Sequence, residues 1–270
     1  MSFYTSLSGM RNAETDLRVI SNNIANAETA GFKKSNAQFF DLVATGGSTD
    51  PRTTPGIGAA VSAITQDFGL GQLEQTGRVL DIAINGDGFI TTANAISGDI
   101  TFTRNGNLQL VASGELQDAS GDLVQAFAVD AAGNPTTTVP SNVVVPTVNA
   151  AGSALASISI DDRGVVGATY SDGTTEPVAK IALASFPATG GLRPIGQSKW
   201  EATADSGTAQ FGEPGIGNFG RVFSGALERS NVDLAEEMVS LLTAQRNFQA
   251  NARAIDTATA ISQTVLNLQR

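Results

Sequence analysis

Each end of this 270-residue chain carries a stripe of apolar residues at helical spacing. The apolar positions recur every three or four residues, so they share one helix face that needs a partner to cover it. The stripe near the start consists of Leu7, Met10, Leu17, Ile20 and Ile24. The stripe near the end consists of Leu234, Met238, Leu241, Phe248, Ile255, Ile261, Val265 and Leu268. The pattern favours assembly over catalysis.

The stretch between residues 60 and 223 has a different pattern, in which short apolar runs alternate with turn residues. The dipeptides Asn85-Gly86, Asn105-Gly106 and Asp172-Gly173 contain residues that tolerate positive φ, and they therefore mark turns. This alternation is typical of an antiparallel β domain. We predict an α+β fold in which N- and C-terminal helices pair as a coiled coil, with a central antiparallel all-β domain.

The same patterns divide the chain into three parts. Residues 1–30 plus 231–270 are expected to form the terminal helical coiled-coil domain, residues 31–59 an extended connector and loop, and residues 60–230 the central β domain. Within the connector, residues 44–58 contain four glycines and two prolines, which argue against a regular element.

Capping residues indicate the helix boundaries. The first helix is expected over residues 3–27. The second is expected to begin at Ser230 or Asn231, because either side chain can accept hydrogen bonds from the first turn. Asp233 and Glu236 then lie near the positive end of the helix dipole, which agrees with this start.

Composition excludes several classes of protein. The formal net charge is −10, from 16 basic and 26 acidic residues, so most of the surface would repel nucleic acid. The chain contains neither histidine nor cysteine, which removes the commonest general base, thiol chemistry and disulfides. No long apolar run predicts membrane insertion, and the N-terminus lacks the features of a cleaved signal peptide. We expect no cofactor, no metal and no catalytic residues.

The two helical segments differ in length. A helix over residues 231–270 would be about 60 Å long, and one of about 25 residues would be roughly 37 Å long. About 20 Å of the longer stripe, around Ile261, Val265 and Leu268, therefore has no partner within the chain. Either the β domain or neighbouring copies must cover it, and the small residues around the stripes favour copies. A contact of this kind that does not close gives a tube or filament.

Acidic pairs are the best candidates for an enzyme. They are Asp161 with Asp162, and Asp81 with Asp87. Adjacent residues on a strand point to opposite faces, so the first pair is better explained as a charged turn. Serine nucleophiles would lack a histidine to activate them.

Two binding sites also deserve consideration. Asn85-Gly86-Asp87-Gly88 resembles part of a calcium loop, but it lacks the full acidic series, and a hairpin turn explains it better. A secreted adhesin or sugar-binding β module would need an exposed aromatic platform, for which Trp200 and Tyr170 are the candidates.

Motifs at both ends resemble those of the bacterial flagellar axial proteins, the rod and hook subunits. The N-terminal motifs are MSFYTSLSG, SNNIAN with Asn22, Asn23 and Asn26, and GFKKS with Gly31 and Phe32. The C-terminal motifs are SGALE, SNVDL with Ser230 and Asn231, and AQRNFQAN with Gln245 and Arg246. Together with landmarks such as FTRNG in the β region, the resemblance covers about two thirds of the chain.

The resemblance implies a homopolymer that forms a hollow tube linking the rod to the filament and transmitting torque. The subunit would pass unfolded through the type III export apparatus without a cleaved signal peptide, and its paired helices would line the tube. Its neighbours would be rod, hook-cap and hook-filament junction proteins. The implied location is the flagellar hook or basal body, outside the cell or spanning the periplasm.

The resemblance is closest to the hook protein, and we interpret the chain as a short hook subunit, with a distal rod subunit as the alternative. Two features favour the rod. The middle of the chain leaves no room for the outer domain inserted in typical hook proteins, and the loop at residues 44–58 is longer than a hook protein would have.

Overall fold

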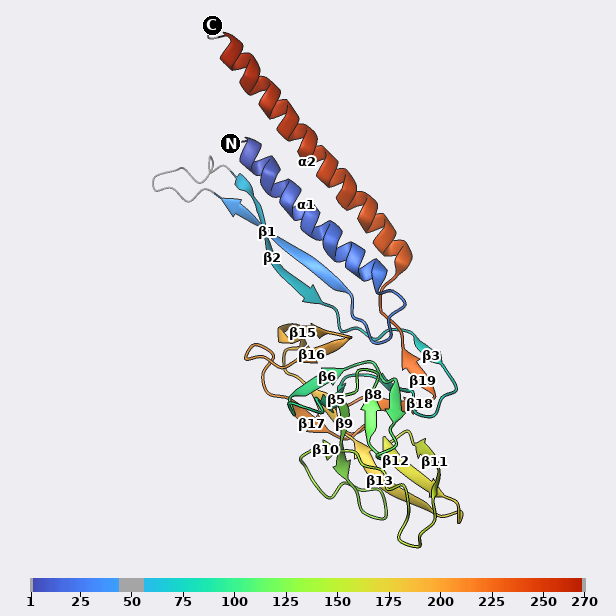
Figure 1. The fold of residues 1–270 in the computed structure, drawn as a ribbon. Helices are drawn as coiled ribbons and strands as arrows, with labels where there is room; N and C mark the ends of the chain where they lie inside the picture. The colour runs from blue at the N-terminus through green and yellow to red at the C-terminus, as the bar shows by residue number, and fades with distance from the viewer. Residues whose placement is uncertain (1, 44–55, 269–270) are drawn as a thin grey trace. The chain divides into compact units, whose positions relative to one another are not determined.

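The structure is a computed structural model that describes residues 2–43 and 56–268 (Figure 1). The chain forms two compact units. The helical unit contains Met1–Ala27, Lys34–Asp67 and Val232–Arg270. The β unit contains Glu28–Lys33 and Phe68–Asn231. Helices and an antiparallel sheet therefore occur in the same chain, as the predicted α+β class requires.

The helical unit is built on two helices, α1 (Ser2–Ala25) and α2 (Leu234–Leu268). At the end of α1, the side-chain amide of Asn26 donates a hydrogen bond to the carbonyl of Asn22 at 2.9 Å. At the start of α2, Asp233 Oδ1 accepts hydrogen bonds from the amides of Ala235 and Glu236 at 2.8 and 3.2 Å. The cap is therefore Asp233 rather than the predicted Ser230 or Asn231.

A two-stranded ribbon completes the helical unit. Its strands, β1 (Ser35–Val43) and β2 (Gly56–Gln66), pair antiparallel and pack along α1. The connector expected over residues 31–59 is therefore a strand for most of its described length, and residues 60–66 belong to this unit rather than to the central β domain. A lone two-stranded ribbon is marginal in water, and packing on a helix stabilises it. Residues 44–55 of the predicted loop lie outside the described residues.

The β unit consists of short antiparallel strands. The strands are β3 (Leu73–Gln75), β4 (Ile82–Asn85), β5 (Phe89–Ala93), β6 (Ile100–Thr103), β7 (Leu108–Leu110), β8 (Leu116–Asp118), β9 (Leu123–Ala128), β10 (Ser141–Asn142), β11 (Leu155–Ile160), β12 (Val165–Tyr170), β13 (Thr175–Ile181), β14 (Leu183–Ser185), β15 (Arg193–Gly196), β16 (Lys199–Glu201), β17 (Gln210–Gly212), β18 (Arg221–Ser224) and β19 (Ala226–Glu228). A short 3₁₀ helix, Thr189–Gly191, precedes β15.

Most of these strands form one sheet with the order β11-β12-β13-β9-β5-β6-β16-β15 and side branches. Two small pairs, β18-β4 and β19-β3, lie outside it. Asp172-Gly173 forms the predicted turn, because it joins the paired strands β12 and β13 and Gly173 has a φ of 85°. Asn85-Gly86-Asp87-Gly88 is a bend and not the predicted hairpin turn, since β4 and β5 pair with different strands.

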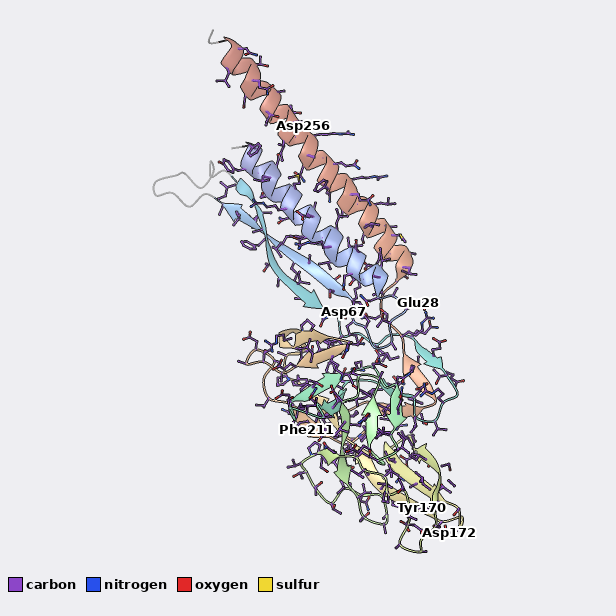
Figure 2. All side chains as sticks on the ribbon, viewed as in Figure 1. Glu28, Asp67, Tyr170, Asp172, Phe211 and Asp256 are labelled. Atoms are coloured by element: carbon purple, nitrogen blue, oxygen red, sulfur yellow. The ribbon has the colours of Figure 1, made fainter. Side chains whose placement is uncertain are left out.

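Two apolar clusters hold the β unit together. The larger contains Ile82, Leu116, Val124 and Tyr170 among its buried members. The smaller is aromatic, and Trp200 is buried in it. Tyr170, labelled in Figure 2, and Trp200 therefore lie in separate cores and do not form an exposed platform for sugars.

Candidate assembly surface

Small residues bring the two helices of the helical unit close together. α1 and α2 lie side by side and run in opposite directions (Figure 1). A Cβ atom at Gly9 would lie 2.6 Å from Oδ1 of Asn251, so the Asn251 side chain packs directly on the backbone of α1 there. Ala13 and Ala244 are buried. Glycine and alanine allow this approach, but they bury little apolar area, so the helix pair has a thin core.

A polar cluster fixes the pair at the other end of α1. Asn23 is buried, and its side chain binds both backbone groups of Ser35, donating to the carbonyl at 2.8 Å and accepting from the amide at 2.9 Å. Its Nδ2 also donates to Glu237 Oε2 at 3.3 Å. The ammonium of Lys34 lies 2.9 Å from Glu237 Oε1 and 3.3 Å from Glu236 Oε2. Asn23 thus connects α1, β1 and α2.

Burial and charge shift two pKa values beside this cluster. Desolvation raises the pKa of the half-buried Asp16 carboxyl, and the charge of Glu237 adds to the effect. Burial alone would lower the pKa of Lys34, but hydrogen bonds to Glu237 and Glu236 outweigh it and raise the pKa. The cluster therefore contains more negative charge than its one lysine neutralises. A pocket of about 290 Å³ opens beside these residues.

The predicted stripe on α1 faces the interior of the unit. Ile20 is buried, and Leu7, Met10, Leu17 and Ile24 are half-buried. Four of these five side chains therefore remain partly accessible after α2 and the ribbon have packed.

The predicted stripe on α2 divides between two faces. Leu241, Phe248 and Ile255 are half-buried, whereas Leu234 and Met238 are exposed. The side chains of Val265 and Leu268 lie outside the described ones.

Glu237 explains why the stripe shifts. This buried glutamate takes the inward position because Lys34 and Asn23 hold its carboxylate. Since residues one apart lie about 100° apart around a helix, Met238 turns away from α1.

The second helix extends beyond the first. α2 has 35 residues and α1 has 24, a difference of about 16 Å at the helical rise. Because Gly9 lies opposite Asn251 in the antiparallel pair, the start of α1 falls near residue 258, and α2 continues past it. Ile261 and Leu266 on this overhang are 60% and 66% exposed. The uncovered stretch predicted from length is therefore present within the helical unit.

The apolar side chains exposed on the helical unit define what we call the apolar surface. Its members come from both helices and from both strands of the ribbon, and such a collection is unusual for a soluble unit of this size. They are Phe3, Tyr4, Phe39, Phe40, Val43, Ile57, Val61, Ile64, Leu234, Met238, Val239, Leu242, Ile261 and Leu266.

The residues of the terminal motifs have varied surroundings. In α1 and its end, Asn22 is exposed, Asn23 buried and Asn26 half-buried. On α2, Gln245 and Arg246 are exposed.

The motif residues of the β unit are mostly covered. Gly31 and Ser230 are buried, and Phe32 and Asn231 are half-buried. Gly31 has a φ of 68°, and a Cβ atom there would lie 2.5 Å from the amide nitrogen of Asn105. Only glycine fits this position.

A buried ionic cluster in the β unit was not predicted from the sequence. Lys33 Nζ lies 2.5 Å from Glu228 Oε1, and both side chains are fully buried. Arg104 Nη1 lies 3.4 Å from the other carboxylate oxygen, and the amide of Gly71 donates to Oε1 at 3.0 Å. Burial lowers the pKa of Arg104, an effect that the charge of Glu228 opposes. The sequence contained one indication of this cluster, because Lys33 and Glu228 both occur in the terminal motifs.

Asp161 and Asp81, one from each acidic pair considered for catalysis, have structural roles. Asp161 accepts hydrogen bonds from the amides of Arg163 and Val165 and pairs with the Arg163 guanidinium, so it shapes the turn between β11 and β12. Asp81 accepts a hydrogen bond from the hydroxyl of Thr76 at 2.7 Å. Across the described residues, acidic side chains form no group of three or more that could hold a metal ion. No helix in the described ranges is long and apolar enough to cross a membrane.

Comparison with known proteins identifies matching families along most of the chain. Residues 3–33 match the family described as flagella basal body rod protein. Residues 83–168 match the flagellar hook protein FlgE/F/G D1 domain. Residues 224–268 match the flagellar basal body rod FlgEFG protein C-terminal family.

Whole-length relatives agree with these matches. The chain is 35% identical to the flagellar basal-body rod protein FlgG of Bacillus subtilis (strain 168) over 281 positions, covering 100% of this chain and 99% of that relative. It is 33% identical to FlgG of Caulobacter vibrioides, covering 98% of each. It is 28% identical to the flagellar hook protein FlgE of Salmonella typhimurium over 411 positions, covering 100% of each.

The fold and these relatives define the class: this is a structural protein of the bacterial flagellum and not an enzyme. Within that class, the chain belongs to the family of flagellar basal-body rod and hook proteins.

Proposed function

We propose that this chain polymerises with copies of itself into a hollow helical tube of the flagellar axis. The apolar surface of the helical unit carries the proposal. Folding of one chain leaves these side chains exposed on both helices and the ribbon, and neighbouring copies would cover them. A heterologous contact that repeats without closing produces a tube.

The helix pair supports an inner position in that tube. α1 and α2 would form a coiled coil lining the channel. The thin core of the pair, built on Gly9, Ala13 and Ala244, makes its stability depend on neighbours. We therefore expect the terminal helices to order fully only on assembly.

Within the axis, we propose the distal rod as the position of this subunit. Length supports the rod, because FlgG relatives align over nearly the length of this chain, whereas alignment with FlgE needs 411 positions for 270 residues. The hook, which the terminal motifs favoured, is the second candidate. The FlgE relatives, which match the whole chain, support it. In either position the subunit would transmit torque.

The partners proposed from the resemblance follow from this role. They are copies of the chain, neighbouring rod, hook-cap and hook-filament junction proteins, and the type III export apparatus. A chain without cysteine suits export in an unfolded state, because it cannot form disulfides before assembly.

Polymerisation can be tested on the overhang of α2. The double variant Ile261→Ser, Leu266→Ser should need a protein concentration more than tenfold higher to form sedimentable polymer. Each substitution removes apolar area that a neighbouring copy would otherwise bury. A matched control, Gln263→Ser with Asn267→Ser, changes polar residues of the same exposed stretch and should assemble normally. Equal assembly of both variants would contradict the proposal.

A truncation separates the roles of the two units. Removal of residues 251–270 should abolish assembly and motility while the β unit stays folded, as measured by fluorescence of Trp200, the single tryptophan of the chain. Polymer formed by the truncated chain would refute a role for α2 in assembly.

Electron microscopy can test the position. Gold-labelled antibody against this subunit should bind the straight shaft of isolated basal bodies. Label along the curved hook would reject the rod and support the hook.

A further inference from the structure

The β unit exposes an isoleucine at the tip of a turn. Ile96 lies between β5 and β6 and is 99% exposed. Single exposed apolar residues are common, and exposure alone implies nothing. Here, however, the side chain projects from a tip and can enter a concave site.

Hydrogen bonds hold this tip in one shape. Asn94 Oδ1 accepts from the amides of Ile96 and Ser97 at 3.0 and 3.1 Å. The Asn94 amide donates to the carbonyl of Asp99 at 2.9 Å, and its side chain donates to Asp122 at 3.1 Å. Because the turn is already ordered, insertion of Ile96 elsewhere would cost little backbone entropy.

An apolar pocket of about 540 Å³ opens elsewhere on the same unit. Its walls include Phe127, Phe211 and Phe219, with Ile216 at the rim, and Figure 2 labels Phe211. Among the described lining residues, Glu213 is the one with a charge, and its carboxylate lies 2.6 Å from the ammonium of Lys180. The pocket therefore suits an uncharged apolar side chain, since an insertion would bury no unpaired charge.

The tip and the pocket lie at opposite ends of one strand. Ala93, just before the turn, pairs with Leu123 at the start of β9, whereas Phe127 near the end of β9 lines the pocket. Phe127 lies five positions after Asp122 along the chain, a distance of about 16 Å in an extended strand. Within one chain Ile96 therefore lies away from the pocket, so an Ile96 side chain that fills the pocket would come from a second copy.

The size of the contact argues for a copy within a polymer. One isoleucine buries far less than the roughly 800 Å² per partner of a stable complex, so this contact alone cannot hold two molecules together. Neighbours already held by the apolar surface of the helical unit would have a high effective concentration, and a small contact then suffices. Two different patches on one molecule also make a head-to-tail contact, the kind that can repeat without closing.

We propose that Ile96 of one subunit inserts into the pocket of Phe127, Phe211, Ile216 and Phe219 on the next, as a second contact that fixes how β units align. This inference rests on the proposed polymerisation.

Crosslinking tests the contact directly, because the natural chain contains no cysteine. Polymer of the double variant Ile96→Cys, Ile216→Cys should give a ladder of covalent multimers on mild oxidation, since each copy has one partner on either side. Ile96→Cys with Glu176→Cys, an exposed residue of β13, is the matched control and should give no ladder. Intact polymer without a ladder for the first pair overturns the inference.

A charge test distinguishes the two proposals. Ile96→Asp should raise the concentration needed for polymer at least tenfold, and Ala95→Asp, on the same exposed turn, should have a much smaller effect. Combining Ile96→Asp with Ile216→Lys should recover much of the loss. Equal effects of the two aspartates, or no recovery, reject the Ile96 contact. Failure of the unaltered chain to polymerise rejects the proposed function instead.

Discussion

The buried ionic cluster of the β unit predicts a large effect from removal of one charge. In Glu228→Gln, the shape of the side chain is kept, but the negative charge between Lys33 and Arg104 disappears. Lys33 Nζ then remains 2.5 Å from a neutral group in a fully buried site. The amide of Gly71 keeps its acceptor, because Oε1 is retained, whereas Arg104 loses the oxygen that it faces in the wild type.

The expected cost is about 3–5 kcal/mol, the range for removing one partner of a buried ion pair. Full burial of both side chains justifies this range rather than the value below 1 kcal/mol of an exposed pair. A small protein unit is stable by only about 5–15 kcal/mol, so this loss is a substantial fraction.

Urea unfolding followed by Trp200 fluorescence measures the cost, because this buried tryptophan reports on the β unit. Glu176→Gln changes an exposed carboxylate and should shift the free energy of unfolding by less than about 0.5 kcal/mol. Lys33→Met combined with Glu228→Gln should cost less than the sum of the single changes, by roughly 0.5–3 kcal/mol. A cost below about 1 kcal/mol for Glu228→Gln, or strict additivity, would refute the argument.

Three further predictions concern the helical unit and use circular dichroism at 222 nm. The variant Gly9→Ala should not gain the roughly 1 kcal/mol of stability that its higher helix propensity would give, because its Cβ meets the Asn251 side chain. The double variant Gly9→Ala, Asn251→Ala should gain it. Asp16→Asn should raise the melting temperature at pH 7, since the raised pKa of Asp16 means that wild-type stability falls as pH rises through its titration. The difference in melting temperature between this variant and the wild type should vanish below the unperturbed pKa of about 3.8. Asp233→Ala should cost about 0.5–2 kcal/mol by removing the cap of α2.

The sequence was sufficient for the fold class because its two periodicities are strong. The helical stripes locate α1 and α2 within a few residues, and turns such as Asp172-Gly173 identify an antiparallel unit. The ribbon was missed because adjacent Phe39 and Phe40 break strand alternation. A register shift between Gln38 and Phe39 accommodates them.

The candidate surface was only partly predictable. Apolar periodicity selects Leu234 and Met238 for the helix interface, yet Glu237 occupies it, because Lys34 and Asn23 satisfy its charge. Such pairing depends on residues more than 200 positions apart, and no local pattern encodes it. Lys33 and Glu228 also pair over a long separation, 195 positions, and each was noticed only as part of a motif.

The exposed and buried features of the helical unit have one common explanation. A helix pair meant to be stable alone would place large apolar residues between its helices, but here Gly9, Ala13 and Ala244 occupy the contact. Several large apolar side chains of the helices, among them Met238 and Ile261, are exposed instead. Because apolar burial is the main source of stability, this arrangement moves much of that stability from the single chain to contacts between chains. In the proposed tube, a subunit that must stay soluble until it reaches its site needs such a distribution.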